Sequence, residues 1–375
     1  MVNFKIIAAN EEPVFTLIEV AHNYNPQSKG KRVKNFLTTS LGKEDFTDEE
    51  TQYWVDAFLE MIGYLLTSGN RLNAFFILAG IGGAGKGVAS DLISNMFGTD
   101  KVGGLQLQEL TPDNRFATAH LENKQVNIVS DSSSKPITDT GLLKAITGYD
   151  DIPVEPKGKD KYMIPRDEVP DMVLVCNNIP KFKDGIEEAI VQRVVMFEFL
   201  NKFRGTEKMN ANLLNEILAD KEEMEWLIYN GIEKYKKMIS EGRDFKARVD
   251  SKKARELLGK HTDPISYVLP KLVKYSDDDL SIEEPIIANE LNRLIIFVAE
   301  SNGMAINHLD TQGKISARFL ASEIRNLFEI GNDWTTKSQY VKKLGISTTI
   351  YPNLYKTDDY NYWLEKMDMN NQINN

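Results

Sequence analysis

A glycine-rich loop ending in a lysine is the first part of this sequence whose residue types and spacing could carry chemistry. Residues 80–88 read GIGGAGKGV, directly after the short apolar run 75–79 and at the start of a helical pattern that continues to residue 97. Glycines let successive backbone N–H groups turn toward phosphate oxygens, the helix amino terminus adds a positive dipole, and Lys86 adds a point charge. The pattern predicts a nucleotide phosphate site, although a glycine-rich turn followed by a surface lysine has the same composition. The residues expected to bind phosphate are Gly80, Gly82, Gly83, Ala84, Gly85, Lys86, Gly87 and Val88.

A nucleotide site of this kind also needs oxygen ligands for magnesium, and the sequence supplies them incompletely. Residue 87 is Gly where Ser or Thr would place a hydroxyl on the ion, so water or Ser90, one turn later, would have to take that position. Asp131 follows the apolar run 126–130 and is the predicted magnesium ligand, because a carboxylate is needed at the end of a neighbouring buried strand. A turn or helix N-cap aspartate is the alternative.

The acid that would polarise an attacking water has no fixed position in the sequence. Residues 132–134 are all Ser, so a second acid is absent from the place where it is expected. Glu109, Asp139 and Asp150 are the candidates, and the sequence does not choose between them.

Two further polar residues adjoin buried-strand patterns. The run 172–176 ends at Asn177, whose amide could orient water or touch the γ-phosphate, and a turn-forming Asn ahead of a proline is the alternative. Arg193 precedes the apolar run 194–197. It could be structural, or it could deliver a guanidinium across a subunit boundary to the γ-phosphate.

The elements that must position these residues form an α/β domain. The first three apolar runs are separated by stretches long enough for crossover connections, which predicts a mostly parallel sheet covered by helices. A helix should begin after Thr47, where Thr47 and Glu50 have the spacing of a capping box. Residues 208–262 are helical in pattern. The expected division is 1–47, a short region of unassigned role with strand-like pieces; 48–72, a helical collar segment; 73–205, the α/β core; 206–275, a helical extension; and 281–375, a winged-helix-like domain with two helices followed by strands.

The charge of the chain is uneven. Its 375 residues contain 45 Lys and Arg against 55 Asp and Glu, a net charge of −10, which argues against a protein that coats nucleic acid by bulk charge. Three segments, 29–34, 156–166 and 334–356, nevertheless hold 12 of the basic residues and one acid. For 156–162, a solvated loop is the alternative, but the turn-forming Lys-Gly-Lys centre, Tyr162 beside the lysines and the position between the strands that end before Asp131 and Asn177 favour contact with a nucleic acid. For 334–356, the exposed face of a small domain is the alternative. The lysines expected to touch DNA are Lys157, Lys159 and Lys161 on a hairpin and Lys342 and Lys343 in a recognition helix and wing.

Composition excludes several classes of protein. Hydrophobic residues make up 42% and charged residues 27%, so the chain should fold rather than remain disordered. Cys176 is the single cysteine, which excludes a disulfide framework and a thiolate zinc cluster and favours a reducing, cytoplasmic setting. Neither a signal-type apolar core nor an uninterrupted apolar stretch of about 18 residues occurs, so we expect no membrane span.

Five blocks in a fixed order resemble the superfamily 3 helicase domain of phage and plasmid primase-helicases. The blocks are GIGGAGKG, FATAHLENKQVNIVSD, LLKAITGYDDIPVEPKGKDKY, MVLVCNNIP and QRVVMFEF. The resemblance covers roughly residues 50–240, about half of the chain, and its specificity comes from the order of the five blocks.

The resemblance implies an AAA+ core that forms a homo-hexameric ring and threads one DNA strand through its pore, using ATP and Mg²⁺. It places the Walker A loop on residues 80–87, the Walker B acid on Asp131, a sensor on Asn177 and an arginine finger on Arg193. The family's additional motif falls on Lys144, Thr147, Gly148 and Asp150 and on the lysine-rich hairpin after them. A replicative DNA helicase of a phage or mobile element, working in a bacterial host cytoplasm, is the function that follows, with duplex DNA bound by the C-terminal domain.

Two other functions compete with this interpretation. A nucleotide-binding DNA initiator or scaffold with impaired hydrolysis would account for Gly87 and for the serines after Asp131. A phosphotransferase acting on a small molecule would also use a phosphate loop, and it predicts a monomer or dimer instead of a hexamer.

Overall fold

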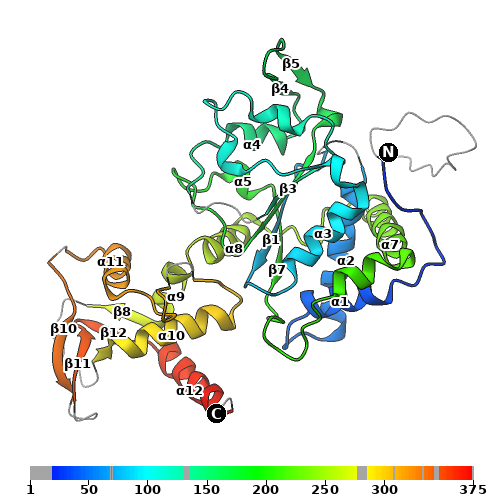
Figure 1. The fold of residues 1–375 in the computed structure, drawn as a ribbon. Helices are drawn as coiled ribbons and strands as arrows, with labels where there is room; N and C mark the ends of the chain where they lie inside the picture. The colour runs from blue at the N-terminus through cyan, green and yellow to red at the C-terminus, as the bar shows by residue number, and fades with distance from the viewer. Residues whose placement is uncertain are drawn as a thin grey trace, which may run out of the picture. The chain divides into compact units, whose positions relative to one another are not determined.

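The computed structural model describes residues 19–67, 69, 71–130, 135–276, 285–306, 309–331, 333–341 and 346–373 (Figure 1). The chain forms two compact units, Met1–Leu258 and Gly259–Asn375. Among the described residues, no helix combines the length and apolar character needed to cross a membrane.

A five-stranded parallel sheet lies at the centre of the first unit. Its order is β2-β3-β6-β1-β7, and every neighbouring pair is parallel. The four predicted apolar runs are confirmed as strands, and the fifth strand, of two residues, is too short to leave a pattern. The strands are β1 (Phe75–Gly80), β2 (Val102–Gly103), β3 (Val126–Ser130), β6 (Asp171–Cys176) and β7 (Val194–Phe199).

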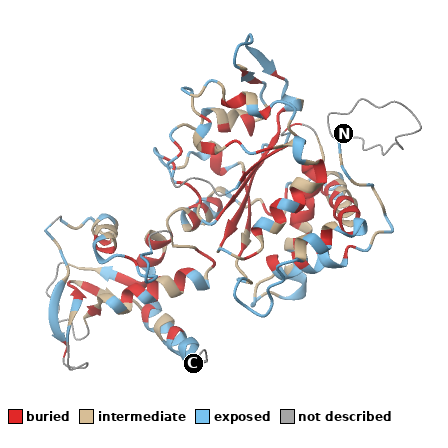
Figure 2. Cartoon of the chain, in the orientation of Figure 1, coloured by how far each residue is buried: buried red, intermediate tan, exposed pale blue. Residues whose placement is uncertain are grey.

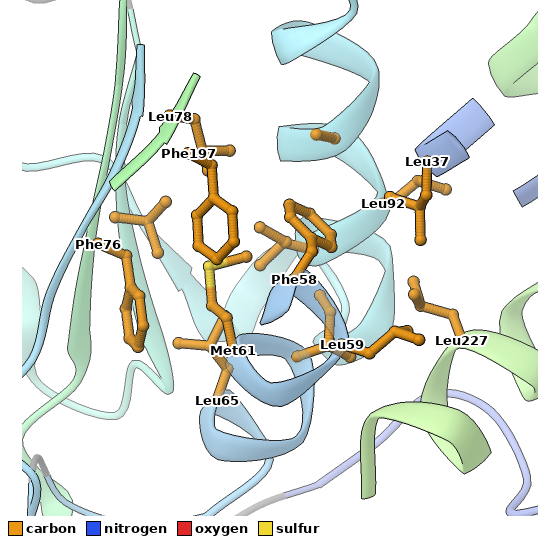
Figure 3. Packing of buried hydrophobic residues seen from close by; sticks show 14 of the residues in the cluster. Leu37, Phe58, Leu59, Met61, Leu65, Phe76, Leu78, Leu92, Phe197 and Leu227 are labelled. Carbon is orange, nitrogen blue, oxygen red and sulfur yellow. The ribbon is translucent and has the colours of Figure 1, made fainter. Parts of the chain in front are cut away.

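Helices cover both faces of this sheet, as the buried strands in Figure 2 indicate. Phe76 and Leu78 pack against α1, α2, α3 and α7, and Figure 3 shows this side of the core. Phe75 and Ile77, one residue out of phase, pack against α4, α5 and α8. This alternation explains why the strands are apolar at every position. The helices are α1 (Lys31–Leu41), α2 (Asp48–Leu65), α3 (Lys86–Phe97), α4 (Gly141–Ile146), α5 (Glu188–Val191), α6 (Leu213–Leu218), α7 (Lys221–Ser240) and α8 (Ser251–Thr262), which continues past the unit boundary.

The helices near the amino terminus agree with the sequence only in part. The capping box before α2 is confirmed, because the Thr47 hydroxyl accepts from the Glu50 amide (3.2 Å) and the Glu50 carboxylate accepts from the Thr47 amide (2.8 Å). The region expected to contain short strands instead has the helix α1, which begins within the basic run 29–34. Of the strand-like pieces themselves, residues 2–7 and most of 14–20 lie outside the described residues.

The second unit contains helices and three small antiparallel pairings. Strands β10, β11 and β9 form one sheet in that order, and β12 pairs with β8. Its elements are α9 (Pro264–Leu272), β8 (Val273–Tyr275), β9 (Ile286–Ile287), α10 (Ala288–Ser301), α11 (Ala317–Leu327), β10 (Lys337–Val341), β11 (Ile346–Tyr351), β12 (Leu354–Lys356) and α12 (Asp358–Ile373). The expectation of a recognition helix within 334–356 is wrong for the described residues of that segment, which form β10, β11 and β12. Alternating Thr, Ile and Tyr residues favour strands there, and the nearest preceding helix is α11.

Candidate nucleotide-binding site

The glycine-rich loop joins the buried strand β1 to the helix α3 at the carboxyl edge of the sheet. Gly83 and Gly85 have φ angles of 83° and 95°, which residues with side chains rarely adopt. A Cβ on Gly80 would lie 2.0 Å from the carbonyl oxygen of Phe199, so the strand end also requires glycine. No described side chain caps α3 at Gly85. The N–H groups of the first helical turn are therefore available to an anion.

Lys86 is folded back over this loop. Its Nζ donates to the carbonyl oxygens of Gly80 (2.8 Å) and Ile81 (2.7 Å), and the residue is only 7% exposed. Burial raises the pKa of the adjacent Cys176 thiol to about 12, although the nearby Lys86 charge lowers it in part. The thiol is therefore neutral, and Lys86 contributes a positive charge to the site.

Asn177 lies beside the loop. Cys176 is the register partner of Ala79, so the residue after β6 is level with the end of β1. A Cβ on Gly82 would be 3.9 Å from the Asn177 Nδ2, and the asparagine is exposed. An amide donor and acceptor is thus placed at the edge of the phosphate loop, where the sequence predicted one.

Asp131 and the serines after it lie outside the described residues. The strand that leads to them is described, and its last residue, Ser130, is paired with Val175 on β6. Ser130, the last described residue before Asp131, therefore lies at the same edge of the sheet as the phosphate loop.

Glu109 is the candidate second acid that approaches this edge. Gln106 Nε2 donates to the Ser130 carbonyl (3.4 Å) and Gln108 Nε2 donates to the Lys135 carbonyl (3.0 Å). The short helical turn Leu107–Glu109 therefore lies against both ends of the segment that contains Asp131. Glu109 is exposed, and its carboxylate accepts from the Gln106 amide (3.0 Å).

Asp139 and Asp150, the other two candidates, lie elsewhere. Asp139 accepts from the Gly141 amide (2.7 Å) and lines a separate cavity of about 250 Å³ that no loop residue lines. Lys144 lies in the same cavity and pairs with Glu187 (2.8 Å). An ideal Cβ on Gly148 would lie 3.1 Å from a carboxylate oxygen of Asp150 and 3.3 Å from Arg193 Nη2. Asp150 therefore lies near Arg193, the predicted arginine finger.

The position that lacks a hydroxyl has room for one. Gly87 is exposed, and a Cβ added to it would meet no described atom within 4 Å. Ser90 is only 6% exposed and lies one turn further into α3. Access for a magnesium ligand is therefore better at residue 87 than at Ser90.

Arg193 lies at the opposite, amino-terminal edge of the sheet. Its carbonyl oxygen accepts from the amide of Phe75, the first residue of β1 (2.7 Å), whereas the phosphate loop follows the last residue of that strand. At about 3.3 Å per residue, the six-residue strand separates the Arg193 backbone from the phosphate loop by roughly 16 Å. The guanidinium donates to the Ala189 carbonyl, and its Nε is buried without a hydrogen-bond partner among the described residues.

The predicted lysine-rich hairpin is present. Strands β4 (Ile152–Val154) and β5 (Tyr162–Ile164) pair antiparallel, and Figure 1 shows the hairpin extending away from the central sheet. Lys157 and Lys159 are exposed at its turn and form no ion pair with a described residue. Lys161 differs from them, because it pairs with Glu155 (2.8 Å), which also pairs with Arg115 (3.3 Å).

In the second unit, the two lysines expected to contact duplex DNA, Lys342 and Lys343, lie outside the described residues. The strands around them carry exposed polar side chains, among them Lys337 and the 59% exposed Tyr340. Arg318 on α11 is also exposed. The sequence predicted no role for it, because its helix was not expected to bind DNA.

The segment after β7 also contacts the phosphate loop, and no sequence motif predicted this contact. The backbone amides of Phe203 and Arg204, which follow β7, donate to the carbonyl oxygen of Gly83 (3.0 and 3.3 Å). The strand order β6-β1-β7 could have indicated this, because it predicts that the segment after β7 adjoins the loop after β1.

One family model and several solved structures are similar to this chain. Residues 78–193 match a protein family of unknown function, DUF5906, and no curated protein matches the chain. Solved structures similar to it include the NrS-1 C-terminal region, at 15% identity and a TM-score of 0.45 over 89% of this chain and 77% of that chain. JCV helicase with a bound small molecule is similar at 13% identity and a TM-score of 0.26, over 63% of this chain and 69% of that one.

Proposed function

We propose that this protein is an ATP- and Mg²⁺-dependent DNA helicase that works as a homo-hexameric ring of the superfamily 3 type. The observation that carries the proposal is the separation of Lys86 and Arg193 on opposite edges of one sheet. A chain with its phosphate loop on one edge and its arginine on the other cannot complete its own site. Neighbouring copies in a ring could complete each other's sites.

The loop edge would bind the nucleotide. The N–H groups of residues 82–88 and the Lys86 ammonium would bind the β- and γ-phosphates, after Lys86 leaves the carbonyls of Gly80 and Ile81. Asn177 would orient the attacking water beside the γ-phosphate. Glu109 is the acid best placed to accept its proton.

Magnesium at this edge would be held chiefly by the phosphates, by water and by Asp131. Such a site is ordinary for this ion, which usually keeps several waters and takes one or two carboxylates. When bound, the ion neutralises charge on the phosphates. A hydroxyl ligand from residue 87 is not available, because that residue is Gly.

The hairpin and the second unit would bind DNA. Lys157 and Lys159, which form no ion pair within the described part of the chain, would face the backbone of one threaded strand around a ring, while Lys161 is paired with Glu155. In the second unit, helices α9, α10 and α11 and the sheet β10-β11-β9 have the element order of a winged helix. Arg318 on α11 and Lys342 and Lys343 between β10 and β11 would then contact duplex DNA.

A competing function is a nucleotide-binding initiator or scaffold without rapid hydrolysis, which the exposed Gly87 favours. Single-turnover ATP hydrolysis with and without single-stranded DNA separates the two. The helicase predicts hydrolysis stimulated by DNA and a hexamer-sized particle with nucleotide. Intact DNA binding without stimulated turnover would favour the scaffold, and a monomer or dimer with nucleotide would favour a small-molecule phosphotransferase.

A further inference from the structure

The residue Arg204 is attached to the middle of the phosphate loop. Its backbone amide donates to the Gly83 carbonyl (3.3 Å), as does the amide of Phe203 (3.0 Å). A Cβ on Gly83 would lie 2.4 Å from the Arg204 Cβ, so that Cβ packs closely against the Gly83 backbone. The base of the arginine side chain is therefore fixed against the loop, whatever the position of its guanidinium.

The Arg204 side chain is exposed, and within the described part of the chain it forms no ion pair. The protein has an excess of ten acidic charges, and many of its surface cations have a carboxylate partner, as Arg71 has Asp167 (2.6 Å). An arginine beside an anion-binding loop and without such a partner is free to bind the anion. Its planar guanidinium can donate two hydrogen bonds to phosphate oxygens.

The strand order determines which part of the nucleotide this arginine would meet. Strand β1 has β6 on one side and β7 on the other. Asn177 and Ser130, the last described residue before Asp131, lie on the β6 side. The γ-phosphate must be held on that side for hydrolysis. Arg204 follows β7 and adjoins Gly83 from the opposite side. The remainder of the nucleotide therefore extends toward Arg204.

We propose that Arg204 binds the diphosphate part of the nucleotide within its own subunit. This inference rests on the proposed nucleotide site and assigns it a second cation, distinct from Lys86 and from the arginine that acts across the subunit boundary. A contact with the diphosphate is made equally before and during hydrolysis. It should therefore contribute to the affinity for ATP and ADP alike and leave the rate of the chemical step unchanged.

Arg204→Ala is a clean test, because alanine keeps both the backbone amide and the Cβ that contact Gly83. Binding of fluorescent ATP and ADP analogues, and of AMP as a competitor, would be measured for the wild type, R204A and R204K. Lys202→Ala is the matched control, since Lys202 is exposed on the same segment and the substitution removes the same charge. ATP turnover would be followed in parallel.

R204A should bind ATP and ADP roughly tenfold or more weakly, as expected for loss of a hydrogen bond to a charged group. R204K should recover part of that affinity, K202A should match the wild type, and R204A should raise KM with little change in kcat. Equal ADP affinity of R204A and K202A would overturn the inference, as would an R204A defect in kcat alone. A wild type that binds no nucleotide would instead refute the proposed function.

Discussion

The Arg193 carbonyl accepts a hydrogen bond from the Phe75 amide (2.7 Å), and this bond fixes the arginine at the end of β1 opposite the phosphate loop. Lys86, at the other end of the same strand, bonds to the Gly80 and Ile81 carbonyls. If both residues serve hydrolysis, they must belong to different subunits at each site.

Mixing two inactive variants tests that arrangement. K86A should lose nucleotide binding, and R193A should bind nucleotide but lose turnover by roughly 10³-fold, the lower range for an arginine finger. In rings formed from an equal mixture, about a quarter of interfaces would pair an intact Lys86 with an intact Arg193. Steady-state ATP hydrolysis should reappear on mixing. A mixture as inactive as the K86A/R193A double variant would place the arginine outside the site.

The hairpin lysines should differ in their effects. K157A/K159A removes two exposed charges without a described partner and should weaken single-stranded DNA binding several-fold and flatten its dependence on salt. K161A removes a charge already paired with Glu155 and should have a smaller effect. Fluorescence anisotropy at several salt concentrations measures both. Equal losses for the two variants would mean that the pairing of Lys161 does not persist on DNA.

Much of this arrangement could be predicted from the sequence, because its signals are local. The capping box at Thr47 and the four apolar runs depend on residues close together in the chain, and each forms the expected element. The strand order depends on contacts distant in sequence. For that reason the approach of Arg204 to Gly83, and of the Leu107–Glu109 turn to the segment after β3, had no signal of their own.

Two other features depend on partners that the sequence patterns do not show. The three hairpin lysines stay predicted DNA contacts, but Lys161 forms an ion pair with Glu155, a pairing that charge counting along the chain does not register. The helix α1 was missed because Gly30 begins it in a left-handed conformation without a side-chain cap from the described residues. Its amides at Arg32 and Val33 instead donate to the distant Glu223 (3.0 and 2.9 Å).

The Gly87 position offers a gain-of-function test. A side chain there meets no described atom within 4 Å, so G87T should fold and should present a hydroxyl to magnesium. We expect a several-fold rise in kcat for ATP at limiting Mg²⁺, measured by phosphate release. G87A is the matched control, because it adds a Cβ at the same position and at least as much helix propensity, but no hydroxyl. If G87A and G87T behave alike, the missing hydroxyl does not limit turnover.

Asp171 should make stability depend on pH. It is 2% exposed at the start of β6, its Oδ1 has no hydrogen-bond partner among the described residues, and burial raises its pKa well above the usual range. Because the folded chain then retains a proton that the unfolded chain loses, stability is lost as pH rises above the ordinary carboxyl pKa toward the folded value.

D171N removes that titration and should raise the Tm at neutral pH, with a smaller gain under acidic conditions. Thermal unfolding followed by circular dichroism, from acidic to neutral pH, measures this difference in Tm. D113N, at an exposed aspartate, should leave the profile unchanged. A D171N variant less stable than the wild type at neutral pH would contradict the assignment of a neutral, buried carboxyl.

Strand displacement tests the central claim most directly. A labelled duplex with either a 3′ or a 5′ single-stranded tail would be incubated with the full chain, ATP and Mg²⁺, with K86A as the control that should be inactive. The account predicts ATP-dependent displacement of the labelled strand with one of the two tails. Failure with both tails, from a protein that binds ATP and single-stranded DNA, would contradict it.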